Sequence, residues 1–499
     1  MDVHDAVERL IEVLVDSSCA DMVEMVVHSP SAGRYRADAV DGSVTFERRI
    51  QGRGWTYEVS ETRGRDPLAN QRTDRFIGHD VERSARFPDR AANAYPIAFD
   101  SIAQFFDSPE APDLLVTHTA RHFADGYLGQ HGSLATVQAR APFLAAGAGI
   151  RSLGTLARAT RVVNVAPTVA ALLGLDPHPG GLGPNGSPDA AALLRRQDGE
   201  VEQDILDGTV ADHVVVVLLD GCNANLLADV IDSGEAPHMA GLLERGVMFG
   251  EGSMASLPTA TLANHTTALT GAHPGHSGVL HNAWLDRRNP ASEPEEVNLL
   301  DLEAMWWAST HVSGEVETLF EALERSRPGS FSSAGFEYCD RGASYSTFAL
   351  VREGDASALP EEDEVRHIDP EAADNGQYRF ISRVDHLSLT DTLDCWRGVH
   401  GNDAPALSWC SLALTDTAGH DSGPHGALAR AAVRDSDARV GEIMRAVEDA
   451  GVLERTAFVV IADHGMEQAD PEVDATWDAA LERTGVSHRD VGGGLIYLT

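Results

Sequence analysis

The sequence predicts an α/β protein built on a doubly wound, mostly parallel sheet that is flanked by helices. Apolar runs of strand length end in aspartate at residues 212–221, 408–416 and 455–463. Runs that are apolar at almost every position are typical of strands buried on both faces of a parallel sheet. Helical patterns follow or separate these runs, and ligands bind at the carboxyl edge of such a sheet. We therefore expect a functional site where the three aspartates meet.

The helices follow from apolar spacing. Helical patterns occupy about 222–232 and 237–246, directly after the first predicted strand. Residues 426–450 form an amphipathic helix that connects the second and third strands. Its apolar face carries Val440, Ile443, Met444 and Val447.

The rest of the chain departs from this rhythm. Short alternating strands, including "SVTFERR" and "GWTYEV", predict a small β region at about 30–110, and residues 113–175 return to α/β character. Residues 176–211 are rich in Gly, Pro and acids and read as a surface linker. Residues 286–406 mix aromatics, turns and an acidic run, which favours an inserted cap that selects the substrate.

Composition excludes several classes of protein. The net charge is -39, and all 38 basic residues are arginine, so long nucleic acids would be repelled. Adaptation to salt or simple solubility is the alternative reason for the acidity. No apolar run is long enough to span a membrane, and the first residues carry acids where a secretory signal carries Lys or Arg. We expect a cytoplasmic protein without a membrane partner, and its oligomeric state is not predicted.

Aspartates at strand ends predict a metal centre. Asp220, Asp416 and Asp463 would project at one edge of the sheet, where three close carboxylates repel one another unless cations lie among them. His420 follows Asp416 in a D-x-x-x-H pattern, and His464 follows Asp463 directly. Mixed carboxylate and imidazole ligands suit zinc, with manganese or iron as alternatives.

A candidate nucleophile lies in "SLPTATLANH", where a Pro-Thr turn enters a helix that we expect to begin near Thr261. Free backbone N–H groups at a helix N-terminus attract phosphate, and a metal would ionise the Thr261 hydroxyl at neutral pH. The alternative is that Thr261 only caps the helix.

These motifs resemble one known family. "LLDG", "PTATLANH", the pattern T-G-x-x-P-x-x-x-G-x-x-x-N that ends at Asn282, D-x-x-x-H and "ADHGM" resemble the alkaline phosphatase superfamily, in its type I phosphodiesterase/nucleotide pyrophosphatase branch. The resemblance implies two divalent metal ions, most simply zinc, and a Thr261 nucleophile. It also implies that the Asn282 amide and the Leu262 N–H hold phosphate oxygens.

The metal ligands are carried over in the same way. One metal would take Asp220, Asp463, His464 and the Thr261 oxygen. The other would take Asp416, His420 and a histidine that the family places in an H-G segment beyond the last Asp-His strand. His488 is the only later candidate, but no glycine follows it.

The missing histidine is expected at the other end of the chain. "QHGSLATVQARAPFLAAGAGI", followed by "VVNVAPTVAALLGL", resembles the family's C-terminal portion and points to His131. The chain then reads as circularly permuted: residues 1–175 are the ancestral C-terminal part, 176–211 the joining linker and 212–499 the ancestral N-terminal part. The alternative is that His131 is a loop histidine of a separate domain.

The implied function is hydrolysis of small, nucleotide-like phosphate diesters through a phosphothreonine intermediate. Neutral Asn282 and the absence of lysine favour a diester over a monoester, because fewer cationic contacts are needed. A phosphomonoesterase, a phosphonate hydrolase or a non-catalytic metal-binding protein are the alternatives. Arg341 could contact the alcohol portion of the substrate, or it could form a buried salt bridge. His265 and His425 are expected to have supporting roles.

Overall fold

The three apolar runs form adjacent strands of an eight-stranded central sheet. In the computed structural model, residues 2–73, 81–82, 94–119, 126–288, 293–354, 359–473 and 476–499 are described. In spatial order the strands are β17 (Tyr345–Ser346), β16 (Ser332–Gly335), β18 (Leu407–Leu412), β11 (His213–Leu219), β19 (Thr456–Ile461), β8 (Phe143–Gly147), β12 (Gly246–Phe249) and β9 (Gly154–Leu156). Strands β17 to β19 are parallel, and only β8 runs against its two neighbours. The predicted fold class is confirmed.

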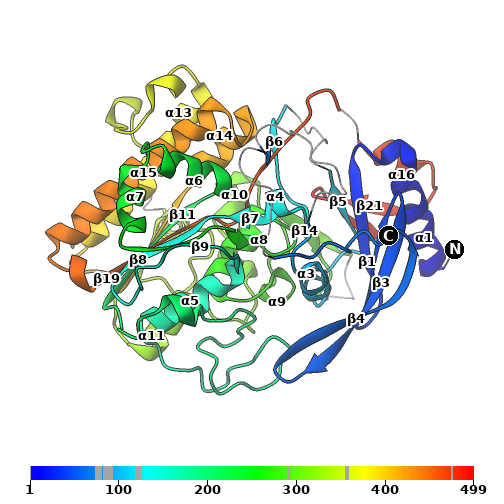
Figure 1. Cartoon of the computed structure of the whole chain (residues 1–499), viewed down its shortest axis with the longest axis horizontal. Helices are drawn as coiled ribbons and strands as arrows, with labels where there is room; N and C mark the ends of the chain where they lie inside the picture. Colours follow the sequence, from blue (N-terminus) through cyan, green and yellow to red (C-terminus); the bar gives the residue numbers. More distant parts are fainter. Residues whose placement is uncertain are drawn as a thin grey trace.

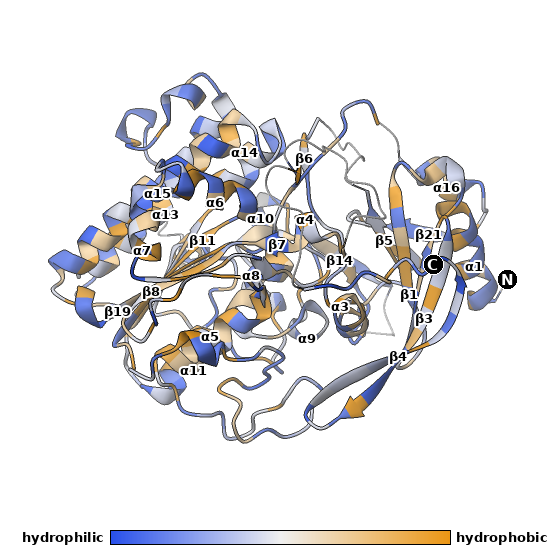
Figure 2. Ribbon diagram, viewed as in Figure 1, coloured by the Kyte–Doolittle hydropathy of each residue, from blue (hydrophilic) through white to orange (hydrophobic). Residues whose placement is uncertain are grey.

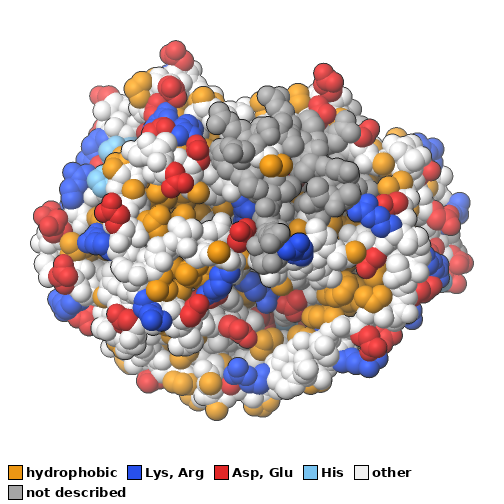
Figure 3. Space-filling view, in the orientation of Figure 1, with side chains coloured by type: hydrophobic (Ala, Val, Ile, Leu, Met, Phe, Trp, Pro, Cys, Tyr) orange, Lys and Arg blue, Asp and Glu red, His pale blue; other side chains and the backbone are white. Residues whose placement is uncertain are grey.

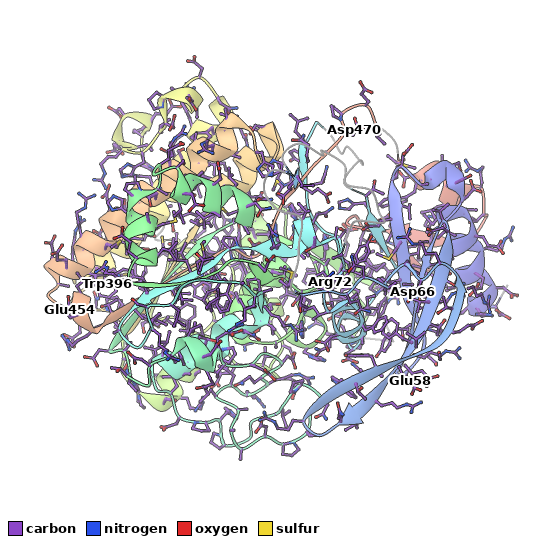
Figure 4. The ribbon with its side chains drawn as sticks, viewed as in Figure 1. Glu58, Asp66, Arg72, Trp396, Glu454 and Asp470 are labelled. Carbon is purple, nitrogen blue, oxygen red and sulfur yellow. The ribbon has the colours of Figure 1, made fainter. Side chains whose placement is uncertain are left out.

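Helices cover both faces of this sheet (Figure 1). On one side lie α6 (Ala224–Asp232), α7 (Pro237–Leu243), α13 (Gly376–Trp396), α14 (Leu414–Ser422) and α15 (Ala427–Asp449). On the other lie α5 (Val165–Leu172), α8 (Thr261–Thr270), α9 (Pro274–Ser277) and α11 (Leu319–Ser326). Burial on both faces explains why β11 is the uninterrupted apolar run His213–Leu219. Trp396, labelled in Figure 4, packs its ring edge-on against His213 at the start of that strand.

A second sheet joins the two ends of the chain. Its seven strands pair antiparallel in the order β21 (His488–Asp490), β22 (Leu495–Leu498), β5 (Leu114–His118), β1 (Val23–Ser31), β2 (Arg34–Ala39), β3 (Gly42–Gln51) and β4 (Gly54–Gly64). Helices α1 (Val3–Leu14) and α16 (Asp478–Glu482) pack together beside it, and α3 (Ala98–Phe105) lies between it and the central body (Figure 1).

Alternating side chains let this sheet serve two cores. Val26 and Val116 pack with α1 and α16, whereas their neighbours Val27 and Leu115 belong to the main core. This is the period-two pattern of a strand that is covered on both faces. In Figure 2 the strands of the central sheet are mostly hydrophobic, whereas the strands of the second sheet, α1 and α15 show mixed hydropathy.

Short elements complete the described structure. They are the strands β6 (Gly129–Gln130), β7 (Arg140–Ala141), β10 (Thr160–Arg161), β13 (Ser253–Met254), β14 (Ala283–Asp286), β15 (Glu295–Asn298) and β20 (Glu467–Gln468), and the helices α4 (Thr136–Ala139), α10 (Leu302–Met305) and α12 (Thr347–Glu353). Strand β20 pairs with β6, which ties the segment after β19 to the segment that carries His131.

Three segments differ in part from their predicted character. Strands β16 and β17 lie within the region 286–406 yet belong to the central sheet, so that region is not wholly a cap. The β16 sequence, "SSAG", lacks the apolar run that would have predicted a core strand. The segment 176–211 is irregular, as expected of a linker, but Leu194 and Ile205 are fully buried, so it is packed against the body. Strand β5 also belongs to the second sheet, although 113–175 was expected to continue the α/β body.

The charge is spread over the surface. Acidic and arginine side chains are interspersed on the face seen in Figure 3. Within the described part of the chain, the helices are all too short or too polar to cross a bilayer.

Candidate metal centre and nucleophile

Two of the three aspartates stand at strand ends, as predicted. Asp220 directly follows β11, and Asp463 follows β19 by two residues. The Gly221 N–H donates to Asp463 Oδ1 at 3.0 Å, which ties the two strand ends together. Asp220 is 5% exposed and Asp463 is fully buried, so both carboxylates are withdrawn from water.

Asp416 is placed differently from the prediction. Strand β18 ends at Leu412, and Asp416 lies in the first turn of α14 rather than at the end of the strand. This helical start puts Asp416 and His420 one turn apart, with His420 Nε2 at 3.4 Å from Asp416 Oδ1. The Ala413 N–H, just before the helix, donates to the buried carboxylate of Asp385 at 2.7 Å. The D-x-x-x-H spacing therefore brings Asp416 and His420 together because both residues lie on one helix.

His131 joins this pair from the first third of the chain. Its Nε2 lies 3.2 Å from His420 Nε2 and 3.7 Å from Asp416 Oδ1. The His131 ring also stacks on the His464 ring, with centroids 3.8 Å apart. Thr259 holds the loop: its hydroxyl accepts from the Gly132 N–H at 2.8 Å and donates to the Ser133 carbonyl at 3.0 Å.

Three histidines are oriented in the same manner. The Nδ1 atoms of His131, His420 and His464 each face a backbone carbonyl, those of Thr259, Gly129 and Gly465, at 2.8, 2.7 and 2.8 Å. A carbonyl accepts only from a protonated nitrogen, so each neutral ring leaves Nε2 with a free lone pair. This is the usual arrangement of metal-binding histidines.

The site contains three sets of metal-ligand atoms, and two of them meet at Asp416. These two are His131, Asp416 and His420, and Asp220, Asp416 and His464; the third is Asp220, His265 and Asp463. The ligand atoms of each set lie within 4.8 Å of one another. His464 Nε2 lies 3.2 Å from Asp463 Oδ2 and 3.4 Å from the Thr261 hydroxyl oxygen. Buried Oδ atoms of Asp220, Asp416 and Asp463 have no hydrogen-bond partner in the described structure. These residues fit two divalent cations, because unpartnered buried oxygens and neutral imidazoles are the donors that such ions bind.

Electrostatics support the same interpretation. Burial, followed by repulsion from the carboxylates of Asp463 and Asp416, raises the pKa of Asp220 to about 7. Burial also raises the pKa of Asp463 to about 6. Burial, followed by repulsion from protonated His464 and His420, holds the pKa of His131 well below its usual range. A divalent cation would stabilise the ionised form of these buried carboxyl groups and would bind the neutral form of the histidines.

The nucleophile candidate begins a helix. Thr261 is the first residue of α8, and the cap position before it is taken by Ala260, so Thr261 is not the cap. Helix α8 is buried along almost its whole length, which fixes its first turn against the centre. Leu262, expected to offer its N–H to phosphate, instead donates to Asn282 Oδ1 at 3.1 Å. This bond positions the Asn282 amide at the same helix start.

His265 lies beside the centre, where it approaches two of the aspartates. Its Nε2 lies 3.8 Å from Asp220 Oδ2 and 4.0 Å from Asp463 Oδ2, and its Nδ1 bonds to the fully buried Glu337 at 2.9 Å. Burial alone would lower the pKa of His265, but Glu337 and the other carboxylates hold it well above its usual range. Nothing in the sequence marks Glu337, because its segment contains no motif.

Arg341 is not brought to the centre. Its guanidinium forms a salt bridge with Glu321 at 2.9 Å and donates to the carbonyls of Val312, Ser313 and Val316. These contacts favour the structural salt bridge over a contact with substrate. His425 bonds to Glu82 at 2.8 Å, consistent with a supporting role.

Comparisons with known proteins agree with these motifs. The sequence model of the family "type I phosphodiesterase / nucleotide pyrophosphatase" matches residues 214–499. An uncharacterized pyrophosphatase/phosphodiesterase of Schizosaccharomyces pombe is 22% identical over 280 residues, which cover 56% of this chain and 49% of that protein. Ectonucleotide pyrophosphatase/phosphodiesterase family member 3 of Rattus norvegicus is 23% identical over 218 residues, covering 43% and 20%. The chain thus spans at most about half the length of these two relatives.

Solved structures are also similar over part of the chain. Murine ectonucleotide pyrophosphatase/phosphodiesterase 5 has 19% identity and a TM-score of 0.37, covering 52% of this chain and 59% of that one. Phosphonoacetate hydrolase from Sinorhizobium meliloti 1021, in complex with phosphonoformate, has 18% identity and a TM-score of 0.34, covering 51% and 57%.

Proposed function

This chain belongs to the type I phosphodiesterase/nucleotide pyrophosphatase family, and from that premise we propose that it hydrolyses small phosphate diesters at the cluster around Thr261. One observation carries the proposal. Seven ligand or nucleophile residues from distant segments converge, and one buried carboxylate oxygen of each of the three aspartates has no hydrogen-bond partner among the described residues.

Each residue has a chemical role in the proposed reaction. Asp220, Asp463, His464 and the Thr261 oxygen would hold one divalent ion, and Asp416, His420 and His131 the other. Two such ions would supply Lewis-acid stabilisation of phosphate charge and would lower the pKa of the threonine hydroxyl. Zinc suits this mixture of imidazole and carboxylate best, with manganese or iron as alternatives.

The proposed hydrolysis has two steps. Thr261 Oγ1 forms a bond to phosphorus while the bond from phosphorus to one alcohol breaks, and that alcohol leaves with a proton. The oxygen of a water molecule then forms a bond to phosphorus while the bond from phosphorus to Thr261 Oγ1 breaks; one proton of the water returns to Thr261, and a phosphate monoester is released. Asn282, fixed by the Leu262 N–H, would donate its amide to a non-bridging oxygen during both steps.

A diester is favoured over a monoester by the charge of the site. Asn282 is the only proposed phosphate contact that is neither a metal ligand nor a backbone group, and its amide is neutral. A diester carries one negative charge fewer than a monoester, so it needs fewer cationic partners. The second candidate function is hydrolysis of a monoester or a phosphonate. A non-catalytic role would require that the chain has kept a complete set of metal ligands although it no longer needs them for catalysis.

Hydrolysis of bis(p-nitrophenyl) phosphate and of p-nitrophenyl phosphate by the zinc-loaded protein would test this proposal. We expect the diester to be preferred, EDTA to abolish turnover and Thr261→Ala to abolish it while both metal ions remain bound. Thr270→Ala, at the other end of α8, is the matched control and is expected to keep full activity. Turnover by Thr261→Ala at the wild-type rate would refute the nucleophile, and bound metal without any hydrolysis would leave the non-catalytic alternative.

The order of segments is a separate proposal. We infer that residues 1–175 correspond to the family's C-terminal part and 212–499 to its N-terminal part. Support comes from the second sheet, where β22, β5 and β1 are successive neighbours, and from one apolar cluster that contains Val7, Leu481 and Ile496. A rearranged chain that joins residues 499 and 2 by a short linker and opens within 183–188 should fold and bind the same metals; loss of metal binding in a folded product would contradict this order.

A further inference from the structure

A cavity of about 220 Å³ adjoins the proposed site. Ala260, His131 and Asn282 are among its lining residues, which places the cavity beside Thr261. His281, Trp477 and Gly493 also line it, together with His118, Gln130, Gly132 and Gly494. Gly493 belongs to the turn before β22, and Trp477 directly precedes α16, so the second sheet and its helix supply a wall of the cavity.

The wall carries no charge that would attract an anion. The described residues that line the cavity include no Asp, Glu or Arg. Burial, with a smaller effect from His118, lowers the pKa of His281 to about 4, so this ring is neutral at pH 7. Trp477 Nε1 donates to Asp490 Oδ2 at 2.8 Å, which occupies the polar edge of the indole. A second phosphate or a carboxylate would therefore lose its hydration there without gaining a cationic partner.

The cavity's size restricts the group further. Pockets that enclose drug-sized ligands measure roughly 300–1,000 Å³, so this one suits a substituent of about one ring. Gly493 helps to keep this space open. It has φ +59°, and a Cβ built at this position would lie 2.3 Å from His281 Cε1. Any side chain at position 493 must therefore displace the His281 ring.

We propose that this cavity holds one uncharged, ring-sized alcohol substituent of the diester, and that it selects against substrates whose substituent bears a second negative charge. The inference rests on the proposed function, because the phosphate must sit at Thr261 for the substituent to enter. It assigns the second sheet and the segment 476–494 a role in substrate choice.

Binding of three probes to the zinc-loaded protein tests this without turnover. Calorimetry would compare phenylphosphonate, inorganic phosphate and phosphonoacetate. Burial of a phenyl ring should make phenylphosphonate bind about tenfold more tightly than phosphate. Phosphonoacetate should bind no more tightly than phosphate. Equal affinity for all three probes, or tighter binding of phosphonoacetate than of phenylphosphonate, would overturn the proposal.

Variants at the cavity wall locate the effect. Gly493→Ala should remove the advantage of the phenyl ring by displacing His281, and Gly493→Ala combined with His281→Ala should restore at least part of it. Thermal unfolding would verify the fold, and His281→Trp, which fills the cavity from the other wall, serves if Gly493→Ala does not fold. An advantage that is unchanged in both Gly493→Ala and His281→Trp would overturn the proposal.

The same protein sample separates the two hypotheses. If bis(p-nitrophenyl) phosphate is not hydrolysed although the phenyl ring still improves binding, the proposed function fails and the binding cavity stands. If the diester is hydrolysed but the ring brings no advantage, the cavity inference alone fails.

Discussion

His131 Nε2 lies 3.2 Å from His420 Nε2, although 289 positions separate the two residues in the sequence. Both nitrogens face Asp416 Oδ1, and both rings are held from behind by a backbone carbonyl. Both imidazoles are neutral, and the lone pairs of their Nε2 atoms face the same carboxylate. Among the described residues, no hydrogen-bond donor lies between these atoms. The relationship is therefore best understood as half of a metal centre.

His131→Ala should remove one of the two metal ions. The remaining Asp416 and His420 offer too few ligands for tight binding, so we expect one zinc per chain instead of two and a fall in diester turnover of at least about 100-fold. Metal content by plasma mass spectrometry would check this. His488→Ala is the control, since His488 lies on β21 and bonds only to the Val486 carbonyl in the described structure. Two zinc ions retained by His131→Ala would rule out this role.

The metal-free protein should lose stability as the pH rises. The pKa values of Asp220 and Asp463 are raised from 3.8 to about 7 and about 6, so the folded state binds protons more tightly than the unfolded state. The contribution of each carboxyl is on the order of 3 to 4 kcal/mol; it is present below about pH 4 and is lost between about pH 4 and 7.

Calorimetry at pH 5 and pH 8 would measure this contribution. Zinc should raise the melting temperature more at pH 8 than at pH 5, because at pH 8 it neutralises carboxylates that are otherwise forced to ionise. In metal-free Asp220→Asn, the loss of stability with pH should be smaller. An equal effect of zinc at both pH values would contradict this account.

Glu337→Gln should destabilise the protein without removing a proposed ligand. Glu337 is fully buried against His265, and removing one charge from a buried pair typically costs about 3 kcal/mol or more. Denaturant unfolding would measure the change. Glu58→Gln is the control. Glu58 lies on the outer strand β4 (Figure 4) and forms an exposed ion pair with Arg49, so its loss should lower the free energy of unfolding by less than about 1 kcal/mol. Similar costs for both variants would mean that the His265 pair is not a support of the centre.

Arg341→Leu separates a structural role from a substrate contact. The guanidinium of Arg341 joins Glu321 to carbonyls of the preceding loop, so its loss should lower the free energy of unfolding by about 2 kcal/mol while the KM for the diester stays unchanged. Arg455→Leu, which breaks an exposed pair with Asp212, should change neither. A tenfold rise in KM with unchanged stability would instead indicate that Arg341 contacts the substrate.

The sequence by itself determined the central strands, the long helix α15 and the chemical types of the ligands. Strand β11 is apolar throughout because both faces are covered, and that pattern is local. Two further patterns are local: the spacing of Asp416 and His420, and the adjacent pair Asp463 and His464. Motif order pointed to His131 as well, but only through resemblance.

Tertiary structure alone decided what meets at the site. Asp416 proved to lie on a helix, because the chain turns at Ala413 under the carboxylate of Asp385, which lies far from it in sequence. Glu337 reaches His265, and Gly493 lines the cavity beside Thr261, only because helices, loops and strands that are distant in sequence pack together. Such contacts depend on the packing of whole elements, whereas the patterns that can be read along a chain record only the periodicity and burial of each element by itself.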